Sequence, residues 1–295
     1  MEAGTHTTSQ ELGRRPAATR PAARYAAGRS RRLWDVVAAV LTGLATAILI
    51  MFIALPLFAI FGKTSPAMFW QQLHSPVALD ALHVSLGTSI VALIGIVALG
   101  TPVSYLLGTR RFPGRPIIIT LFELPLVLPP AVAGIALFAA FGRFGILGSQ
   151  LTAVGVQLPF TWVAVVMAQA FVAMPFFVRQ ATAGFASVDP HLLGVSRTLG
   201  AGSARTFFRV AAPLAGPSLS AGAALSWARA LGEFGATTLF AGSLQGTTQT
   251  LPLAIYGEFS AANMEAALAM GALMVALSGA ILAGVKMLRR TEYWK

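Results

Sequence analysis

Hydrophobic residues in this sequence form long continuous runs, in place of the alternating or 3.6-residue patterns of soluble strands and helices. A helix needs about 20 apolar residues to cross a hydrocarbon core about 30 Å thick. Six runs approach or exceed that length, at residues 36–61, 84–107, 117–141, 156–178, 214–240 and 266–285. The pattern predicts an all-α integral membrane protein whose six transmembrane helices lie within residues 33–290.

The composition agrees with a membrane protein. Hydrophobic residues make up 56% of the 295 residues and charged residues 11%, whereas soluble domains carry about 25% charged residues. The sequence contains no cysteine, which excludes disulfides, thiolate metal ligands and a cysteine nucleophile.

The net charge of +11 is unevenly distributed along the chain. Lys and Arg concentrate in the N-terminal tail, in the loops at residues 108–116 and 179–213, and at the C-terminal end; only Lys63, Arg143 and Arg229 fall elsewhere. Cytoplasmic loops of membrane proteins carry an excess of Lys and Arg. The asymmetry therefore predicts that both termini are cytoplasmic, and it accounts for the basic charge without a nucleic-acid partner.

The first 32 residues are rich in Arg, Ala, Thr and Ser and have no apolar periodicity. This composition predicts a disordered basic cytoplasmic tail. The apolar run that follows is much longer than the ~7–15 residues of a cleaved signal segment. We therefore interpret the run as a helix that stays in the membrane.

Proline interrupts the third predicted span, at Pro125, Pro129 and Pro130. Each proline removes a helical hydrogen bond, and a membrane helix tolerates this where neighbouring groups or a cavity satisfy the freed carbonyls. The segment predicts either a packing kink or a break that lines a cavity.

Two charges of opposite sign fall inside the fifth predicted span. Arg229 and Glu233 are four residues apart, so they are expected to pair on one helix face. At a rise of about 1.5 Å per residue they lie roughly 25–30 Å from Pro213, near the outer boundary of the membrane. A structural pair and a role along a substrate path both remain open.

Motifs for covalent chemistry are missing. The Gly-Lys-Thr at residues 62–64 lacks the upstream glycine of a phosphate-binding loop, since Leu57 occupies that position. The four histidines form no H-E-x-x-H pair, and no G-x-S-x-G elbow occurs. His74, Asp80 and His83 share one segment, for which a solvated loop is favoured over a metal site. The sequence thus predicts no catalytic residue, no metal and no cofactor in this chain.

The loop at residues 179–213 is unusually long and carries its own helix signals. Asp189 followed by Pro190 is typical of a helix N-cap and first turn. Gly200 is a helix-terminating residue. The apolar residues between them are spaced for a short amphipathic helix: Leu192, Leu193 and Leu199, with Ser196 on the same side. The pattern predicts a short interfacial helix from Asp189 to Gly200.

This loop resembles the EAA loop of bacterial ABC importer permeases, whose pattern is E-A-A-x-x-x-G followed nine residues later by I-x-L-P. Gly200 and residues 210–213 fit the spacing, while residues 194–196 read Gly-Val-Ser in place of E-A-A. The resemblance implies a coupling helix that docks into a groove of an ATP-binding subunit. The residues it assigns to that contact are Asp189, Pro190, Gly194, Ser196, Arg197, Leu199, Gly200 and Pro213.

Further segments resemble the permeases of molybdate, tungstate and sulfate importers, namely residues 124–130, 171–179, 187–190, 197–201, 228–237 and 250–256. The resemblance covers residues 80–287. It implies the type I ABC importer permease fold and a non-enzymatic, multi-pass subunit of a molybdate importer in the bacterial cytoplasmic membrane. Sulfate, thiosulfate or tungstate are the alternative substrates. The implied partners are a second copy, two ATP-binding cassette subunits that bind the ATP, and an extracytoplasmic oxyanion-binding protein.

In this family the substrate pathway would be made by spans three to five. The candidate residues are Pro129, Pro130, Arg229, Glu233 and Thr237, and residues 242–250 are expected to face the binding protein. A carboxylate repels an oxyanion, so Glu233 is expected to be paired and not a ligand. The rival class is an ion-coupled secondary transporter, which needs titratable residues at mid-membrane; only Glu123 and the Arg229–Glu233 pair are available.

Overall fold

A computed structural model describes residues 22–292, and within that range all regular secondary structure is helical. The chain divides into two compact units, residues 1–56 and 57–295. The first unit holds most of helix α1 (Ala22–Lys63). Residues 1–21 of the predicted tail lie outside the described residues. Helix α1 begins well before the predicted boundary at residue 33, because Ala and Arg are strong helix formers.

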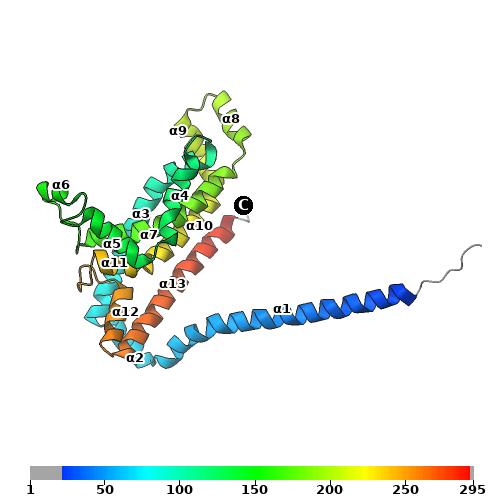
Figure 1. The fold of residues 1–295 in the computed structure, drawn as a ribbon, viewed down its shortest axis with the longest axis horizontal. Helices are drawn as coiled ribbons and strands as arrows, with labels where there is room; N and C mark the ends of the chain where they lie inside the picture. The colour runs from blue at the N-terminus through cyan, green and yellow to red at the C-terminus, as the bar shows by residue number, and fades with distance from the viewer. Residues whose placement is uncertain (1–21, 293–295) are drawn as a thin grey trace, which may run out of the picture. The chain divides into compact units, whose positions relative to one another are not determined.

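The second unit is built around three long helices, α3 (Pro76–Thr109), α7 (Trp162–Ala186) and α10 (Ala212–Leu231). They run side by side, and each contacts the other two (Figure 1). Small residues allow the close approach that membrane helices need. At Gly108 of α3, a Cβ atom would lie 2.7 Å from the Cβ of Phe185 on α7.

Further helices flank these three. Helix α13 (Met264–Glu292) packs against α10, α12 (Leu251–Ser260) and α2 (Pro66–Leu73). A small core of Ala78, Ala81, Leu251, Ala254 and Met270 joins α3, α12 and α13. Helices α2 and α12 lie at one end of the second unit, and α8 (Pro190–Thr198) and α9 (Ser203–Thr206) lie at the other end (Figure 1).

Several helices begin at a hydroxyl or carboxylate cap followed by proline. Ser65 accepts a hydrogen bond from the Met68 N–H at the start of α2, and Ser75 accepts one from the Ala78 N–H at the start of α3. The side-chain oxygen satisfies a first-turn N–H, and proline at the next position has no N–H to satisfy. Short sequence signals therefore fix these helix starts.

The third predicted span is two helices and not one. Helix α4 (Arg115–Val127) and helix α5 (Pro130–Phe141) meet at an angle of 117°. Leu128 and Pro129 have extended backbones, with ψ of 132° and 134°. Consecutive prolines cannot donate the hydrogen bonds that would continue α4, so the prolines produce a sharp break.

The fifth predicted span, residues 214–240, is also divided. Helix α10 ends at Leu231, and helix α11 (Gly235–Phe240) starts after a short break. The fourth predicted span is shifted, since residues 156–161 precede α7 and residues 179–186, predicted as loop, are its last turns. A five-residue π-helical segment, η1 (Phe207–Ala211), leads from α9 into α10.

Four described helices are long and apolar enough to cross a membrane, at residues 34–63, 76–109, 162–186 and 264–281. The bent pair α4 and α5 makes a fifth candidate if it is counted as one span. Helix α10 falls short of this test because it is rich in Gly, Ser and Pro and carries Arg229. The structure therefore supports a multi-pass protein with four or five candidate spans.

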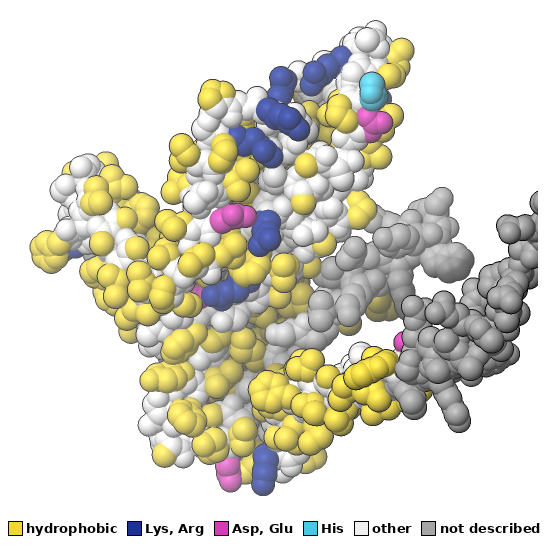
Figure 2. Space-filling model, turned by 45° about the vertical axis from the view of Figure 1, so that its right-hand side comes forward, with side chains coloured by type: hydrophobic (Ala, Val, Ile, Leu, Met, Phe, Trp, Pro, Cys, Tyr) yellow, Lys and Arg dark blue, Asp and Glu magenta, His cyan; other side chains and the backbone are white. Residues whose placement is uncertain are grey.

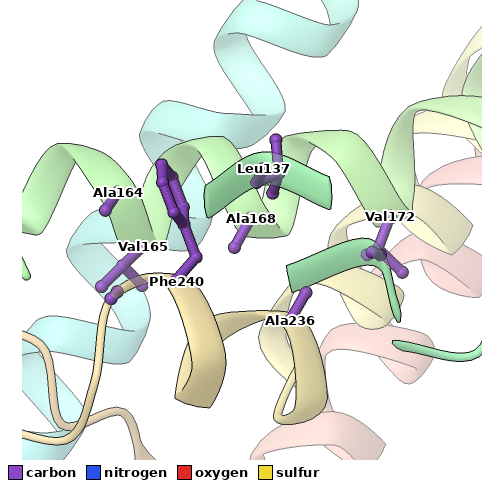
Figure 3. Packing of buried hydrophobic residues seen from close by; sticks show 9 residues of the cluster. Leu137, Ala164, Val165, Ala168, Val172, Ala236 and Phe240 are labelled. Carbon is purple, nitrogen blue, oxygen red and sulfur yellow. The ribbon is translucent and has the colours of Figure 1, made fainter. Parts of the chain in front are cut away.

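The two short helices that follow the breaks pack together on α7. Their shared core contains Leu137 of α5, Ala164, Val165, Ala168 and Val172 of α7, and Ala236 and Phe240 of α11 (Figure 3). A further short helix, α6 (Gly148–Ala153), contacts α5. The broken segments are thus fixed against a long helix of the bundle.

Candidate functional site

The two helix breaks meet in the second unit. Helix α5 begins at Pro130 and α11 begins at Gly235, and a Cβ atom on Gly235 would lie 2.8 Å from the Cβ of Pro130. One turn further, a Cβ atom on Gly134 would lie 2.8 Å from the Ala236 carbonyl oxygen. The two helix starts are therefore in backbone contact, which only glycine permits. Non-helical backbone at membrane depth occurs where it is buried in protein or lines a cavity.

The predicted Arg229–Glu233 pair is confirmed, and it holds one of these breaks. Arg229 Nη1 lies 2.7 Å from Glu233 Oε2, and the Glu233 side chain is fully buried. The other oxygen, Oε1, accepts a hydrogen bond of 2.8 Å from the Ala236 N–H. Glu233 thus joins the end of α10 to the first turn of α11, and both of its oxygens are engaged.

Polar side chains are buried between the long helices. Ser85 Oγ accepts a 2.7 Å hydrogen bond from the Leu251 N–H, and Ser89 Oγ accepts one of 3.1 Å from Trp227 Nε1. Ser226 Oγ donates to the Ala173 carbonyl on α7 at 2.7 Å. These bonds connect α3, α7, α10 and α12 through their interior.

Three fully buried residues have neutral polar side chains with no such partner within the described residues. Gln169 of α7 has no hydrogen bond at either its oxygen or its nitrogen, and Thr237 of α11 and Thr250, which precedes α12, have none at their hydroxyls. An unmade hydrogen bond of this kind costs about 1–3 kcal/mol. Thr237 was predicted as a pathway residue. Gln169 was not, although a glutamine inside an apolar run was a signal in the sequence.

The segment at residues 242–250 forms a turn that is held together by its own hydrogen bonds. The Leu244 carbonyl accepts from the N–H groups of Thr247, Thr248 and Gln249, and Thr248 Oγ1 accepts from the Leu244 N–H. Gln245 Nε2 donates to Asp80 Oδ2 at 3.0 Å, which ties the turn to the first helical turns of α3. The segment is a fixed surface feature at the α2 and α12 end.

Asp80 is therefore tied to this turn by its side chain. His74 Nδ1 lies 2.8 Å from the Trp70 carbonyl oxygen within its own helix end. Within residues 22–292, the histidine and acidic side chains form no group of three close enough to hold a metal ion.

A short helix is present where the sequence predicts one, as α8. Asp189 Oδ1 accepts a 2.9 Å hydrogen bond from the His191 N–H at its start. At its end Gly200 has φ of +81°, its N–H donates to the Arg197 carbonyl, and the Ala201 N–H donates to the Ser196 carbonyl. This pair of bonds is a Schellman motif, which requires a left-handed residue at the glycine position.

One face of α8 anchors the helix to the bundle. Leu193 is buried in a cluster with Phe185 and Val188 at the end of α7 and with Ala211 and Ala215 around the start of α10. Ser196 Oγ lies 3.0 Å from Thr206 Oγ1 of α9. Ser196, predicted as a contact residue for a partner, is therefore engaged within the chain.

The other face of α8 is exposed and partly apolar. Leu192, Val195 and Leu199 are exposed, Leu199 by 81%. Asp189, Pro190, Gly194, Arg197 and Gly200 are also exposed, and so is Pro213 in the first turn of α10. Exposed apolar side chains gathered at one place mark a surface for another molecule. The sequence pattern grouped Leu192, Leu193 and Leu199 in one amphipathic helix, but of these only Leu193 is buried, and the pattern did not include Val195.

Comparison with known proteins assigns the class. Residues 100–290 match the family described as binding-protein-dependent transport system inner membrane component, and the chain belongs to this family. It is a multi-pass protein of the inner membrane. Among solved structures, a chain of a bacterial ABC transporter that imports the polysaccharide alginate shares the fold, with a TM-score of 0.70 and 16% identity over 88% of this chain and 96% of that chain.

Relatives narrow the family further. The chain is 40% identical over 238 residues to the molybdenum transport system permease protein ModB of Mycobacterium tuberculosis, covering 80% of this chain and 89% of that protein. It is 32% identical over 242 residues to the sulfate transport system permease protein CysT of Escherichia coli, covering 81% and 87%. The predicted membership among the molybdate-type permeases is confirmed.

Proposed function

We propose that this chain is the transmembrane subunit of an ATP-driven importer that moves molybdate across the cytoplasmic membrane. The observation that carries the proposal is the 40% identity, over 80% of the chain, to a molybdenum transport permease. Sulfate or thiosulfate is the second candidate substrate, because a sulfate permease is 32% identical over a similar length. Tungstate is a tetrahedral dianion like molybdate and remains the third.

The proposed topology has six spans and cytoplasmic termini. Helix α10 supplies the sixth span. Its 20 residues are long enough for about 30 Å, and its neighbours α3, α7 and α13 shield its polar side chains. Most Lys and Arg side chains visible in Figure 2 lie in its upper half, near α8. The positive-inside rule then makes the α8 end cytoplasmic and the turn at residues 242–250 external.

Helix α8 is the proposed coupling helix. Its exposed face, with Leu192, Val195 and Leu199, would enter a groove of the ATPase subunit. Its inner face packs in one cluster with Phe185 in the last turn of α7 and with Ala215 in the first turn of α10. A displacement of α8 by the ATPase would therefore move the cytoplasmic ends of two long helices together. ATP is bound and hydrolysed by the ATPase, and no residue of this chain takes part in covalent chemistry.

The proposed pathway runs past the two helix breaks. Helices α7 and α10 flank α8 at one end of the unit. At the other end α7 contacts α5 and α11, and α10 leads into α11 through the short break. Gln169 and Thr237 are buried without partners in the described state, and opening of the break region would let water or the anion satisfy them. Glu233 acts as a positioning residue, because Arg229 compensates its charge.

The proposed assembly contains two copies of this chain, two ATPase subunits and an external binding protein that supplies the anion. The turn at residues 242–250, held by Asp80, would face that binding protein. A member of a binding-protein-dependent family requires such a donor, and a solved relative in fold was crystallised with its periplasmic protein.

The test of the class is uptake into proteoliposomes that hold the co-purified permease and ATPase, with binding protein and labelled molybdate outside. We expect uptake that requires ATP inside and persists when an ionophore dissipates ion gradients. Uptake without ATP that collapses with the ionophore would instead assign the chain to ion-coupled secondary transporters.

A further inference from the structure

A basic pocket lies beside α8, separate from its exposed apolar face. It has a volume of about 310 Å³ and lies between the end of α3, the start of α4 and the junction of α7 with α8. Arg110, Arg111 and Arg115 line one side, and Pro190 and Leu193 line the other. Three arginines close together in sequence therefore line a single concave surface.

Among the residues whose side chains the structure describes, none of these arginines forms an ion pair. The one ion pair found there joins Arg229 to Glu233. Arg115 Nε donates a 2.8 Å hydrogen bond to the Leu107 carbonyl, which fixes its guanidinium group at the end of α3. The nearest acidic residue in sequence to the lining, Asp189, caps α8 through its Oδ1. The pocket thus keeps a positive charge that a bound anion would compensate.

The pocket adjoins exposed apolar surface on two helices. Leu106, one turn before the arginines on α3, is 48% exposed, and Ile117 and Leu121 on α4 are 74% and 65% exposed. Helix α3 is a candidate span that ends at Thr109, so Arg110 and Arg111 follow its last turn directly. The arginines therefore lie where a membrane's hydrocarbon meets its headgroups.

We propose that this pocket binds the phosphate of an anionic phospholipid whose acyl chains lie along the exposed apolar residues of α3 and α4. The planar fork of arginine matches phosphate oxygens in pairs, and basic pockets between membrane helices on the cytoplasmic side hold acidic headgroups. Because Pro190 and Leu193 line the same pocket, the bound headgroup braces the start of α8. The site is independent of which anion the importer carries.

The test is lipid binding to the purified, delipidated full chain in detergent, followed as the rise in melting temperature with added phosphatidylglycerol. Phosphatidylcholine and inorganic phosphate are the parallel additions. The variant is R110Q/R111Q, with Arg115 kept because its hydrogen bond holds the turn. The matched control is R205Q/R209Q, which removes two exposed arginines at the same end but outside the pocket.

We expect phosphatidylglycerol to raise the melting temperature of the wild type, and phosphatidylcholine and inorganic phosphate not to raise it. The R110Q/R111Q variant is expected to bind it about thirtyfold more weakly, roughly fivefold for each arginine near an acidic headgroup, and the control to bind near the wild-type value. Equal loss in both variants, or no loss in either, would overturn the proposal. If inorganic phosphate raises the melting temperature as much as phosphatidylglycerol does, the bound phosphate does not have to come from a lipid, and the proposed lipid site is wrong. If R110Q/R111Q does not fold, the second variant is R110K/R111K, which keeps both positive charges but lacks the planar guanidinium groups. This variant should lose part of the affinity for phosphatidylglycerol. Unchanged affinity would contradict the proposed paired contacts between arginine and phosphate.

Discussion

At the residue scale, Gly200 is the most constrained position of the proposed coupling helix. Its φ of +81° closes the Schellman motif at the end of α8, and no neighbouring atom lies within 4 Å of where a Cβ would be. The restriction is therefore conformational and not steric crowding. A side chain in the left-handed region costs about 1–2 kcal/mol.

Gly200→Val is predicted to shift the end of α8 and to reduce both ATPase retention and uptake. The control is Gly202→Val, since Gly202 has an extended backbone with φ of −66° and also has open space around it. Co-purified ATPase and molybdate uptake are measured for both variants. Equal behaviour of the two would contradict the assignment of α8 as the coupling helix.

Because Arg229 and Glu233 form an ion pair, the effects of replacing each of them on stability are predicted not to add in the double variant. Arg229→Gln leaves the buried Glu233 carboxylate without its partner, a change that costs about 3–5 kcal/mol for buried pairs; partial exposure of Arg229, 28%, places the expected loss at or below the lower limit. Glu233→Gln keeps an acceptor for the Ala236 N–H. Melting temperatures of both single variants and of the double variant give the coupling energy. The double variant should be more stable than the sum of the single losses predicts, and strict additivity would show that the pair is not coupled.

Local spacing was enough to predict some of these contacts. The i,i+4 relation predicted Arg229 with Glu233, and the Asp-Pro and Gly signals predicted α8. The bond from Ala236 to Glu233 depends on a break that no spacing reveals. Gln245 and Asp80 are 165 residues apart in sequence, so their contact follows only from the packed fold.

At the scale of elements, the proposed pathway depends most on the two short helices after the breaks. Helices α5 and α11 touch through Pro130, Gly134 and Gly235, and neither glycine has room for a Cβ atom. They are fixed on α7, the same helix that contacts α8 at its other end. A change in α7 therefore reaches both regions.

Gly235→Val is predicted to push α5 and α11 apart. Its Cβ would lie 2.8 Å from the Pro130 Cβ and 3.3 Å from the Ala131 backbone nitrogen, and overpacking of this kind costs about 1–3 kcal/mol. Uptake should fall steeply while the ATPase still co-purifies. Gly216→Val in α10, which meets no atom within 4 Å, is the control and should transport normally. Normal uptake by Gly235→Val would remove the break region from the pathway.

The sequence predicted where the chain is apolar better than how its helices are divided. The continuous apolar runs predicted the positions of α1, α3, α7 and α13, because the free energy of moving a segment out of water is set by its composition alone. The prolines at 129 and 130 indicated an interruption, but the 117° angle depends on how α5 packs against α11 and α7. Helices α2 and α12 are too short to be recognised as spans, and their positions follow from contacts with α13.

At the scale of the whole molecule, the predicted tail and the transport unit are separable in function. The proposed coupling helix, the breaks and the external turn all lie in the second unit, residues 57–295. Deletion of residues 2–28 is therefore predicted to leave uptake near the wild-type level, measured at matched membrane expression. A large loss of uptake at equal expression would assign the tail a role in transport or assembly.

In the proposed assembly each subunit has a separate role. This chain would supply the path and the coupling helix, the ATPase would supply energy, and the binding protein would choose the anion. A buried carboxylate neutralised by Arg229 leaves no unpaired negative charge at the breaks to repel a dianion. Substrate choice therefore has to be measured on the complete system.

The most direct measurement is uptake of labelled molybdate by cells with and without this gene, in the presence of excess tungstate or sulfate. The proposed function predicts that uptake is lost in the deletion strain, returns with the gene on a plasmid, and is inhibited by tungstate but not by sulfate. Unchanged molybdate uptake together with reduced sulfate uptake in the deletion strain would contradict the proposal and assign the chain to a sulfate importer.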